Sequence, residues 1–170
     1  MKSPLKRIRL SLVCERPFLL FDREWMLITA GTFDSFNTMT ASWGALGTLW
    51  SRPVAFGFIR PTRHTFGFAN RSPVFTCSFF GRRYRAALEF CGTKSGRDVD
   101  KVKATGLTPV KGKAGCVYFA EARLVLECRT IHAQDIDPRR FLDPTIEKNY
   151  PKKDYHRMFI GEVIGCLRRD

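Results

Sequence analysis

The sequence has no run of apolar residues long enough to cross a membrane, a feature that needs about twenty residues in a helix. Residues 2–16 combine basic side chains with the patch Leu-Ser-Leu-Val, but Cys14, Glu15 and Arg16 interrupt the apolar run and no small-residue cleavage site follows. We therefore expect a cytoplasmic protein with no membrane partner. The length of 170 residues suits a single domain, residues 1–170, with a core of its own.

Closely spaced cysteine pairs are absent as well. The six cysteines contain no Cys-x-x-Cys pair, the spacing that brings ligands together around a zinc ion or an iron–sulfur cluster. The sequence thus predicts no metal site, and its thiols are expected to be reduced and mostly buried. Cys91 stands out because it precedes a glycine-bearing turn.

Acidic residues are scarce. Sixteen Asp and Glu face 29 Lys and Arg, which gives a formal net charge of +13. Such an excess attracts polyanions, so a basic nucleic-acid-binding module is a competing interpretation. The basic residues are spread through the chain without an exposed aromatic stacking pattern, a zinc-finger motif or an RNP-type motif. Nucleic acid is therefore the less favoured partner, and the same charge would also attract an anionic cofactor.

The chain also lacks the Gly-x-Gly-x-x-Gly fingerprint of a dinucleotide-binding unit. It has instead a series of strand-like segments, at residues 25–30, 37–44, 53–59, 74–80, 118–131 and 157–167, with helical patterns at 62–70, 82–90 and 95–105. The alternation in 118–131 predicts a strand with one face exposed to solvent. Residues 135–154 predict a loop with a helical turn at 138–142. This order has no βαβ rhythm and predicts a mainly β fold with helical insertions.

The most informative stretch is Asn37-Thr38-Met39-Thr40-Ala41-Ser42-Trp43-Gly44. In an extended chain, Thr38, Thr40 and Ser42 form a row of hydroxyls on one face, while an amide, a thioether, a methyl group and an indole form the other. The second face suits a flat heteroaromatic ring, which needs apolar contact and hydrogen bonds at its edge. The same alternation is also typical of an ordinary half-buried strand.

Two further segments carry the pattern of an anion site at a helix start. Thr62 is positioned to cap a helix whose first turn holds Arg63 and Thr65. Ser95-Gly96-Arg97-Asp98 matches a capping box and predicts that a helix starts there, with Lys101 farther along it. Both patterns are equally compatible with capped surface helices that bind nothing.

Several motifs occur in one order along the chain: Asn37–Gly44, Trp50-Ser51-Arg52-Pro53-Val54, Ile59–Thr65, Cys91–Lys101, Glu121-Ala122, Glu127-Cys128, Tyr150-Pro151, Asp154–Met158 and Ile160-Gly161-Glu162. Together they resemble the flavin reductase-like family of FMN-binding split barrels, the group that includes flavoredoxin. The resemblance runs from about residue 24 to residue 165 and implies a split β-barrel.

The resemblance also implies a set of cofactor-binding residues, although none with a catalytic role. Those expected along the ring and ribityl chain are Asn37, Thr38, Met39, Thr40, Ala41, Ser42 and Trp43. Those expected elsewhere are Arg60, Thr62, Arg63 and Thr65 at the phosphate or ribityl end, Ser95, Gly96 and Lys101 in a turn that meets the cofactor, and His156 on a loop near the flavin. Lys101 is a candidate cation for either the pyrimidine edge of the ring or the phosphate. His64 stands where relatives commonly have an aromatic residue.

The function that the resemblance implies is that of an FMN-binding flavoprotein, a flavin reductase that moves electrons from NADH or NADPH through FMN to an acceptor. Because no dinucleotide fingerprint is present, the nicotinamide would bind over the flavin and not in a separate domain. A homodimer is expected. The alternative is an electron carrier of the flavoredoxin type, in which a redox partner protein supplies the electrons.

Overall fold

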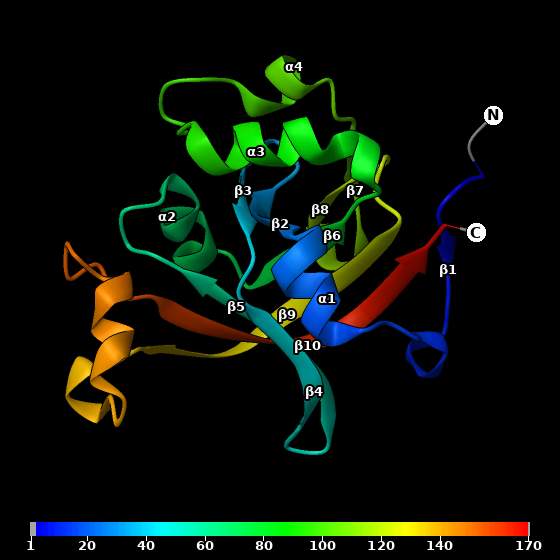
Figure 1. Ribbon diagram of the computed structural model, residues 1–170. Helices are drawn as coiled ribbons and strands as arrows, with labels where there is room; N and C mark the ends of the chain where they lie inside the picture. Colours follow the sequence, from blue (N-terminus) through cyan, green and yellow to red (C-terminus); the bar gives the residue numbers. More distant parts are fainter. Residues whose placement is uncertain (1–2, 170) are drawn as a thin grey trace.

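A computed structural model of the chain describes residues 3–169 (Figure 1). Its strands are β1 Lys6–Arg7, β2 Met26–Thr32, β3 Ser35–Ala41, β4 Gly44–Leu49, β5 Arg52–Ile59, β6 Val74–Phe79, β7 Pro109–Lys111, β8 Val117–Phe119, β9 Leu124–Asp135 and β10 Arg157–Arg168. Its α-helices are α1 Pro17–Leu19, α2 His64–Arg71, α3 Arg85–Thr93 and α4 Lys101–Thr105. Short 3-10 or π-helical turns are η1 Leu10–Leu12, η2 Leu20–Glu24, η3 Arg82–Tyr84, η4 Lys113–Gly115, η5 Pro138–Arg140 and η6 Pro144–Asn149. The predicted mainly β fold with helical insertions is confirmed.

One antiparallel sheet dominates the molecule. Its strand order is β3-β2-β6-β9-β10-β5-β4, and β1 pairs with the far end of β10. The longest pairing joins β9 and β10, from Asp135 opposite Arg157 to Leu124 opposite Arg168. In Figure 1, α3 and α4 lie together over one side of the sheet, and α2 packs against β2 and β3. The ends of β3 and β5 and the start of β10 thereby come together at one corner.

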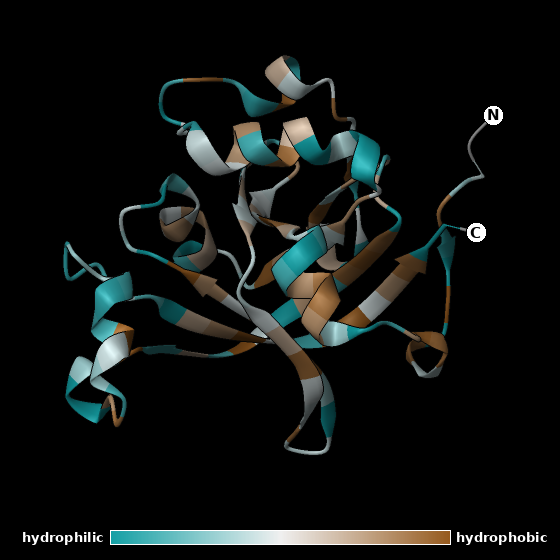
Figure 2. Ribbon diagram, viewed as in Figure 1, coloured by the Kyte–Doolittle hydropathy of each residue, from teal (hydrophilic) through white to brown (hydrophobic). Residues whose placement is uncertain are grey.

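The sheet is buried on both faces around β9, so the expectation of one wet face is wrong. Leu126 and Cys128 belong to one hydrophobic cluster, whereas Val125 lies in a second cluster with Leu88 of α3 and Phe119 of β8. The segment predicted as one strand is two, because residues 120–123 separate β8 from β9. Figure 2 shows hydrophobic residues concentrated in these central strands. The covering helix α3 ends more than thirty residues before β9 begins, so the local alternation could not reveal it.

The helices predicted from the sequence lie in the expected segments, but the residues that cap them differ from the prediction. The amphipathic segment at 82–90 is η3 followed by α3, whose Leu88 and Cys91 are buried as expected. Residue 95 does not begin a helix. Asp100 is the N-cap of α4, and its Oδ1 accepts from the Lys103 backbone N–H at 3.0 Å. Ser95 and Asp100 could each accept a capping hydrogen bond, and the Asp100 carboxylate is the group that does so.

The segment between β9 and β10 is a long polar loop. It contains the predicted helical turn as η5 and a second one, η6. In Figure 1 this segment, drawn in orange, projects beyond the sheet beside α2, and in Figure 2 it is largely hydrophilic. Its return to β10 brings residues 150–156 back to the corner of the sheet described above.

The cysteines are free thiols, and all but Cys14 are buried. This confirms the expectation of mostly buried thiols. Among residues 3–169, no helix combines the length and apolar character that a membrane crossing requires.

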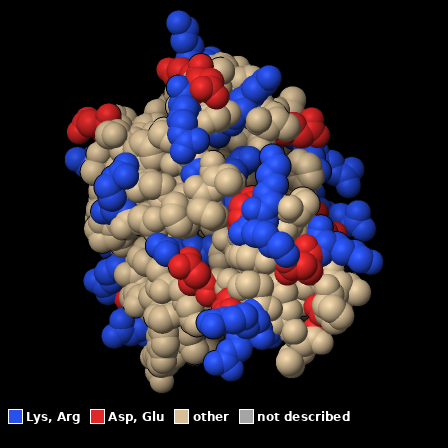
Figure 3. Space-filling view, turned by 90° about the vertical axis from the view of Figure 1, so that its left-hand side faces the viewer, with Lys and Arg blue, Asp and Glu red and all other residues tan. Residues whose placement is uncertain are grey.

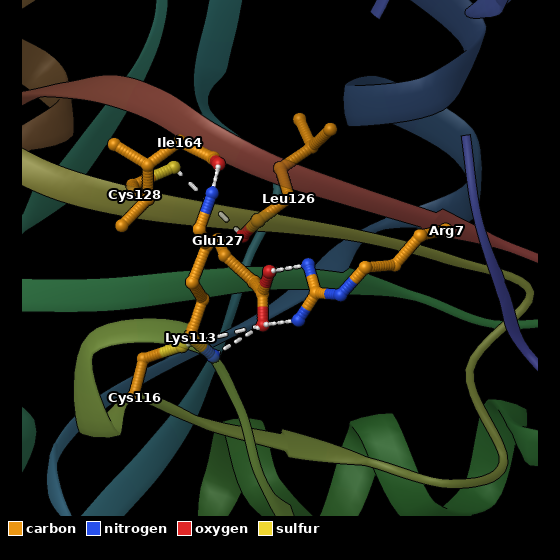
Figure 4. A network of polar contacts seen from close by, with 7 residues as sticks. All are labelled: Arg7, Lys113, Cys116, Leu126, Glu127, Cys128 and Ile164. Atoms are coloured by element: carbon orange, nitrogen blue, oxygen red, sulfur yellow. Dashed lines mark hydrogen bonds and ion pairs between the residues drawn. The ribbon is translucent and has the colours of Figure 1, made fainter. Parts of the chain in front are cut away.

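A fully buried carboxylate, Glu127 of β9, ties the start of the chain to the sheet. Arg7 donates from Nη1 to Glu127 Oε2 at 2.6 Å and from Nη2 to Oε1 at 3.3 Å. Figure 4 shows the carboxylate between this guanidinium and the Lys113 backbone N–H, which donates to Oε1 at 2.7 Å. A Cβ on Gly165 would lie 2.1 Å from Oε2, so β10 can pass here only as glycine. A charge this deeply buried needs such partners, because water cannot reach it.

We expect Arg7→Ala to lower the free energy of unfolding by about 2–3 kcal/mol, since it leaves a buried carboxylate without its cation. The loss should fall below that of a fully buried pair because half of the Arg7 side chain, 54%, is exposed. Urea unfolding measures it. Arg9→Ala removes the same charge from an exposed neighbour and should change stability little, so equal losses in the two variants would contradict the role of Arg7.

Candidate functional site

Two adjoining cavities lie at the corner where β3, β5, the end of α3 and the start of β10 meet. The larger, a cleft of about 280 Å³, is lined by Met39, Thr40, Ala41, Ser42, Trp43, Phe58, Arg60, Arg63, Gly92 and His156. The smaller, of about 120 Å³, is lined by Met39, Thr62, Arg63, His64, Thr65, Thr93, Lys94, Ser95, Gly96, Arg97 and Lys101. Met39 and Arg63 line both, so the two cavities form one elongated site.

The predicted site residues are brought together here, with two exceptions. Asn37 and Thr38 line neither cavity. The Thr38 hydroxyl lies 2.9 Å from that of Thr29 and 3.3 Å from Ile28 O, inside the sheet. The row of hydroxyls is therefore not a single open face: Thr40 Oγ1 bonds to Leu88 O of α3. Of the three hydroxyls, only that of Ser42, just after β3, has no hydrogen-bond partner within residues 3–169.

Arg63 stands between the two cavities. Its Nη2 donates to Gly92 O at 2.7 Å, at the carboxyl end of α3. Burial, and then the charge of Arg60, lower the pKa of Arg63 from its usual value. Two guanidinium groups so close to one cleft repel each other, and an anion placed between them would relieve that repulsion.

Lys101 is buried, with 5% of its surface exposed. Its Nζ donates to Thr38 O at 2.7 Å and to Cys91 O at 2.9 Å, and so links β3 to α3. Burial lowers the pKa of Lys101 to about 8. An ammonium has three N–H donors, so one remains without a partner in the described chain. Burial also raises the pKa of the neighbouring Cys91 thiol, which makes it a poor nucleophile.

Arg60 and Thr62 hold the β9–β10 segment in place. Arg60 Nη1 donates to Asp154 Oδ1 at 2.7 Å and Nη2 to Asn149 O at 2.8 Å. Thr62 Oγ1 donates to Asp154 Oδ2 at 3.3 Å. Thr62 is thus not the cap of α2, as the sequence had suggested, because Arg63 is the N-cap residue and makes no side-chain capping bond.

The far wall of the cleft is aromatic. Trp43 is 42% exposed, and the centroid of its ring lies 4.8 Å from that of His156. Burial, and then the charge of Arg60, lower the pKa of His156 to about 4, so this imidazole is neutral at neutral pH.

The turn between α3 and α4 forms the floor of the smaller cavity. Ser95 Oγ accepts from the Arg97 backbone N–H at 3.2 Å, which closes the turn. A Cβ on Gly96 would lie 2.0 Å from Asn37 Oδ1. Asn37 cannot yield easily, because its Nδ2 donates to Thr65 Oγ1 at 2.7 Å. Asn37 therefore acts from behind the cavity, holding the turn against α2.

The sequence did not single out several lining residues, namely Phe58 and Gly92 in the cleft and Thr93, Lys94 and Arg97 in the smaller cavity. Lys94 and Arg97 flank the predicted Ser95-Gly96 pair, and their charge was the available signal. His64 lies in this electropositive region: burial, followed by the charges of Arg97, Lys101 and Arg71, lowers its pKa.

Basic residues also dominate the surface on this side. Figure 3 looks at the side that carries α2 and the β9–β10 segment, where Lys and Arg are spread across the face and outnumber Asp and Glu. A field of this sign favours the approach of anions.

The fold and the site together define a protein that binds an elongated anionic ligand. An apolar and aromatic cleft with polar edges adjoins a small cavity with several cations, and this geometry suits an elongated ligand with a flat ring system at one end and an anionic group at the other.

A model of the flavin reductase like domain matches residues 19–170, and the chain belongs to this family. The fold is also that of solved relatives. An FMN-binding domain of a flavin reductases-like enzyme from Shewanella baltica OS155 superimposes with a TM-score of 0.71 at 18% identity, over 99% of this chain and 78% of that one. Flavoredoxin of Desulfovibrio vulgaris (Miyazaki F) gives 0.68 at 24% identity, over 96% and 77%.

The NADH:FAD oxidoreductase of Streptomyces globisporus C-1027, solved in complex with NAD and FAD fragments, gives a TM-score of 0.66 at 21% identity, over 86% of this chain and 77% of that one. No protein with a curated description matched. The family resemblance seen in the sequence and the split-barrel fold class that it implied are confirmed.

We expect Gly96→Ala to destabilise the protein by about 1–3 kcal/mol, because the added methyl group overlaps the buried Asn37 amide. Thermal unfolding measures the loss. Gly81→Ala is the matched control, since a Cβ there meets no atom within 4 Å. If both variants unfold alike, Asn37 does not constrain the turn.

Proposed function

We propose that the protein is an FMN-binding flavoprotein that works as a flavin reductase with a nicotinamide electron donor. Bound flavin would supply the electron-transfer chemistry, which no side chain of the site can perform alone. The observation that carries the proposal is the pair of adjoining cavities in a chain of the flavin reductase like family: a cleft with aromatic and apolar side chains beside Arg60 and Arg63, and a smaller cavity lined by several cations.

The residues present fit this cofactor at both ends. Arg63 offers a guanidinium to a phosphate, and one N–H of the Lys101 ammonium has no partner within residues 3–169. Met39, Trp43 and Phe58 offer apolar contact to a ring. Thr62, Thr65 and Ser95 add hydroxyls along the smaller cavity.

The role of this chain would be to hold the ring, neutralise the phosphate and leave one ring face open. Trp43, which is partly exposed, borders the opening. The complex of the Streptomyces globisporus oxidoreductase with NAD and FAD fragments supports a nicotinamide donor. We propose that this donor enters the same cleft as the flavin. We further propose a homodimer, for which the exposed apolar side chains of Trp50 and Leu142 offer contact area.

The similarity to flavoredoxins supports a second candidate, an electron carrier reduced by a partner protein. The two functions differ in what reduces the flavin, and one spectrum separates them. The protein is mixed with FMN, desalted and treated anaerobically with NADH and then NADPH.

We expect the oxidised-flavin absorption bands to remain after desalting and to bleach with one of the nucleotides. Bands that persist with both nucleotides would favour the carrier. Failure to retain or titrate any flavin would contradict both functions.

We expect Arg63→Ala to weaken FMN binding by about 1.5–3 kcal/mol, through loss of a charge-assisted contact to the phosphate. Fluorescence titration of FMN measures the change. Arg82→Ala removes an equal charge outside both cavities and should bind FMN like the unmodified protein. Unchanged affinity in Arg63→Ala would remove this residue from the phosphate end.

A further inference from the structure

Tyr150 is a buried side chain next to the cleft that the proposed function does not use. Only 2% of its surface is exposed, although it belongs to the polar β9–β10 segment. The Arg60 guanidinium lies 4.9 Å from the centre of its ring, and the rings of Phe141 and Tyr155 lie at 6.1 and 4.9 Å. These contacts fix the ring in one position, so the hydroxyl group points to a fixed place.

That hydroxyl meets the imidazole of His156. The Tyr150 Oη lies 3.0 Å from His156 Nδ1. The hydroxyl oxygen also takes a hydrogen bond from the backbone of His156. Within residues 3–169 no acceptor other than Nδ1 is available for the hydroxyl proton, so the hydroxyl donates to Nδ1. Burial raises the pKa of Tyr150, so the proton stays on the phenol. A neutral imidazole that accepts at Nδ1 carries its own proton on Nε2.

His156 lines the cleft, and its Nε2 has no hydrogen-bond partner in the described chain. In the same part of the chain, the only buried side-chain nitrogen or oxygen without a partner is Ser78 Oγ. Nε2 is therefore not sealed inside the protein, and the cavity that His156 lines is the cleft beside Trp43.

We propose that Tyr150 is a positioning residue that locks His156 in the Nε2–H tautomer, so that the cleft contains one fixed hydrogen-bond donor for a carbonyl oxygen or unprotonated ring nitrogen of the bound ligand. A fixed tautomer matters because a neutral imidazole offers either a donor or an acceptor at a given nitrogen. The identity of the ligand, a flavin or a nicotinamide amide, rests on the proposed function. The tautomer of His156 is independent of that function, because it follows from the contact with Tyr150.

The tautomer is read directly from a long-range proton–nitrogen correlation spectrum of nitrogen-15-labelled, flavin-free protein at pH 7. The chain has three histidines, and loss of one signal set in His156→Gln assigns His156. We expect an unprotonated Nδ1 and a protonated Nε2. A protonated Nδ1 in the unmodified protein would overturn the proposal without any variant.

Tyr150→Phe keeps the ring and removes the hydroxyl, and we expect both His156 nitrogens to move to the intermediate shifts of mixed tautomers. Tyr155→Phe is the matched control, because its hydroxyl bonds to Glu147 Oε1 at 2.7 Å in the same aromatic cluster and does not contact His156. An unmoved His156 spectrum in Tyr150→Phe would overturn the positioning role.

The ligand half of the inference has its own readout. In Tyr150→Phe we expect a two- to fivefold increase in either the Kd for FMN or the KM for the nicotinamide, with kcat changed less, and no change in Tyr155→Phe. A shifted tautomer with both constants unchanged would overturn the ligand contact alone. If no variant bound flavin, the proposed function would fail while the tautomer result remained readable.

Discussion

The carboxyl end of α3 is the point on which the site depends. The last carbonyls of a helix lack partners within it and carry the negative end of its dipole. In this chain Lys101 donates to Cys91 O, and Arg63 donates to Gly92 O. Because Lys101 also donates to Thr38 O, these bonds join α3, β3 and the starts of α2 and α4. The cations of the smaller cavity are thus oriented by the fold itself.

This arrangement also explains how two long basic side chains can be ordered beside a cavity. A lysine or arginine loses about 2 kcal/mol of rotamer freedom when it is fixed in place. Here that cost is met during folding by hydrogen bonds to backbone carbonyls. An anion that enters the smaller cavity would meet donors that are already oriented, which is the condition for tight binding.

The sequence was sufficient to locate most strands, because period-two patterns of apolar residues are local. It was also sufficient to select the segments that meet at the site. It could not predict the partners of Arg60 or Lys101, since Asp154 and Thr38 are each more than sixty residues away along the chain. It also failed to separate a cap from a turn: Ser95 and Asp100 are both good acceptors, and only packing decides which one begins α4. The role of Tyr150 was missed because a tyrosine in a charged loop carries no periodic signal.

The contact between Arg7 and Glu127 has a consequence for the order of folding. β1 pairs Lys6 with Arg168 and so closes a loop of nearly the whole chain. Closing so long a loop before other contacts exist is entropically unfavourable. The pocket around Glu127 also needs β9, β10 and η4 in place before it can receive the guanidinium. We therefore expect β1 to dock last, so that a chain emerging from the ribosome carries an unpaired carboxylate in its central strand until both ends are available.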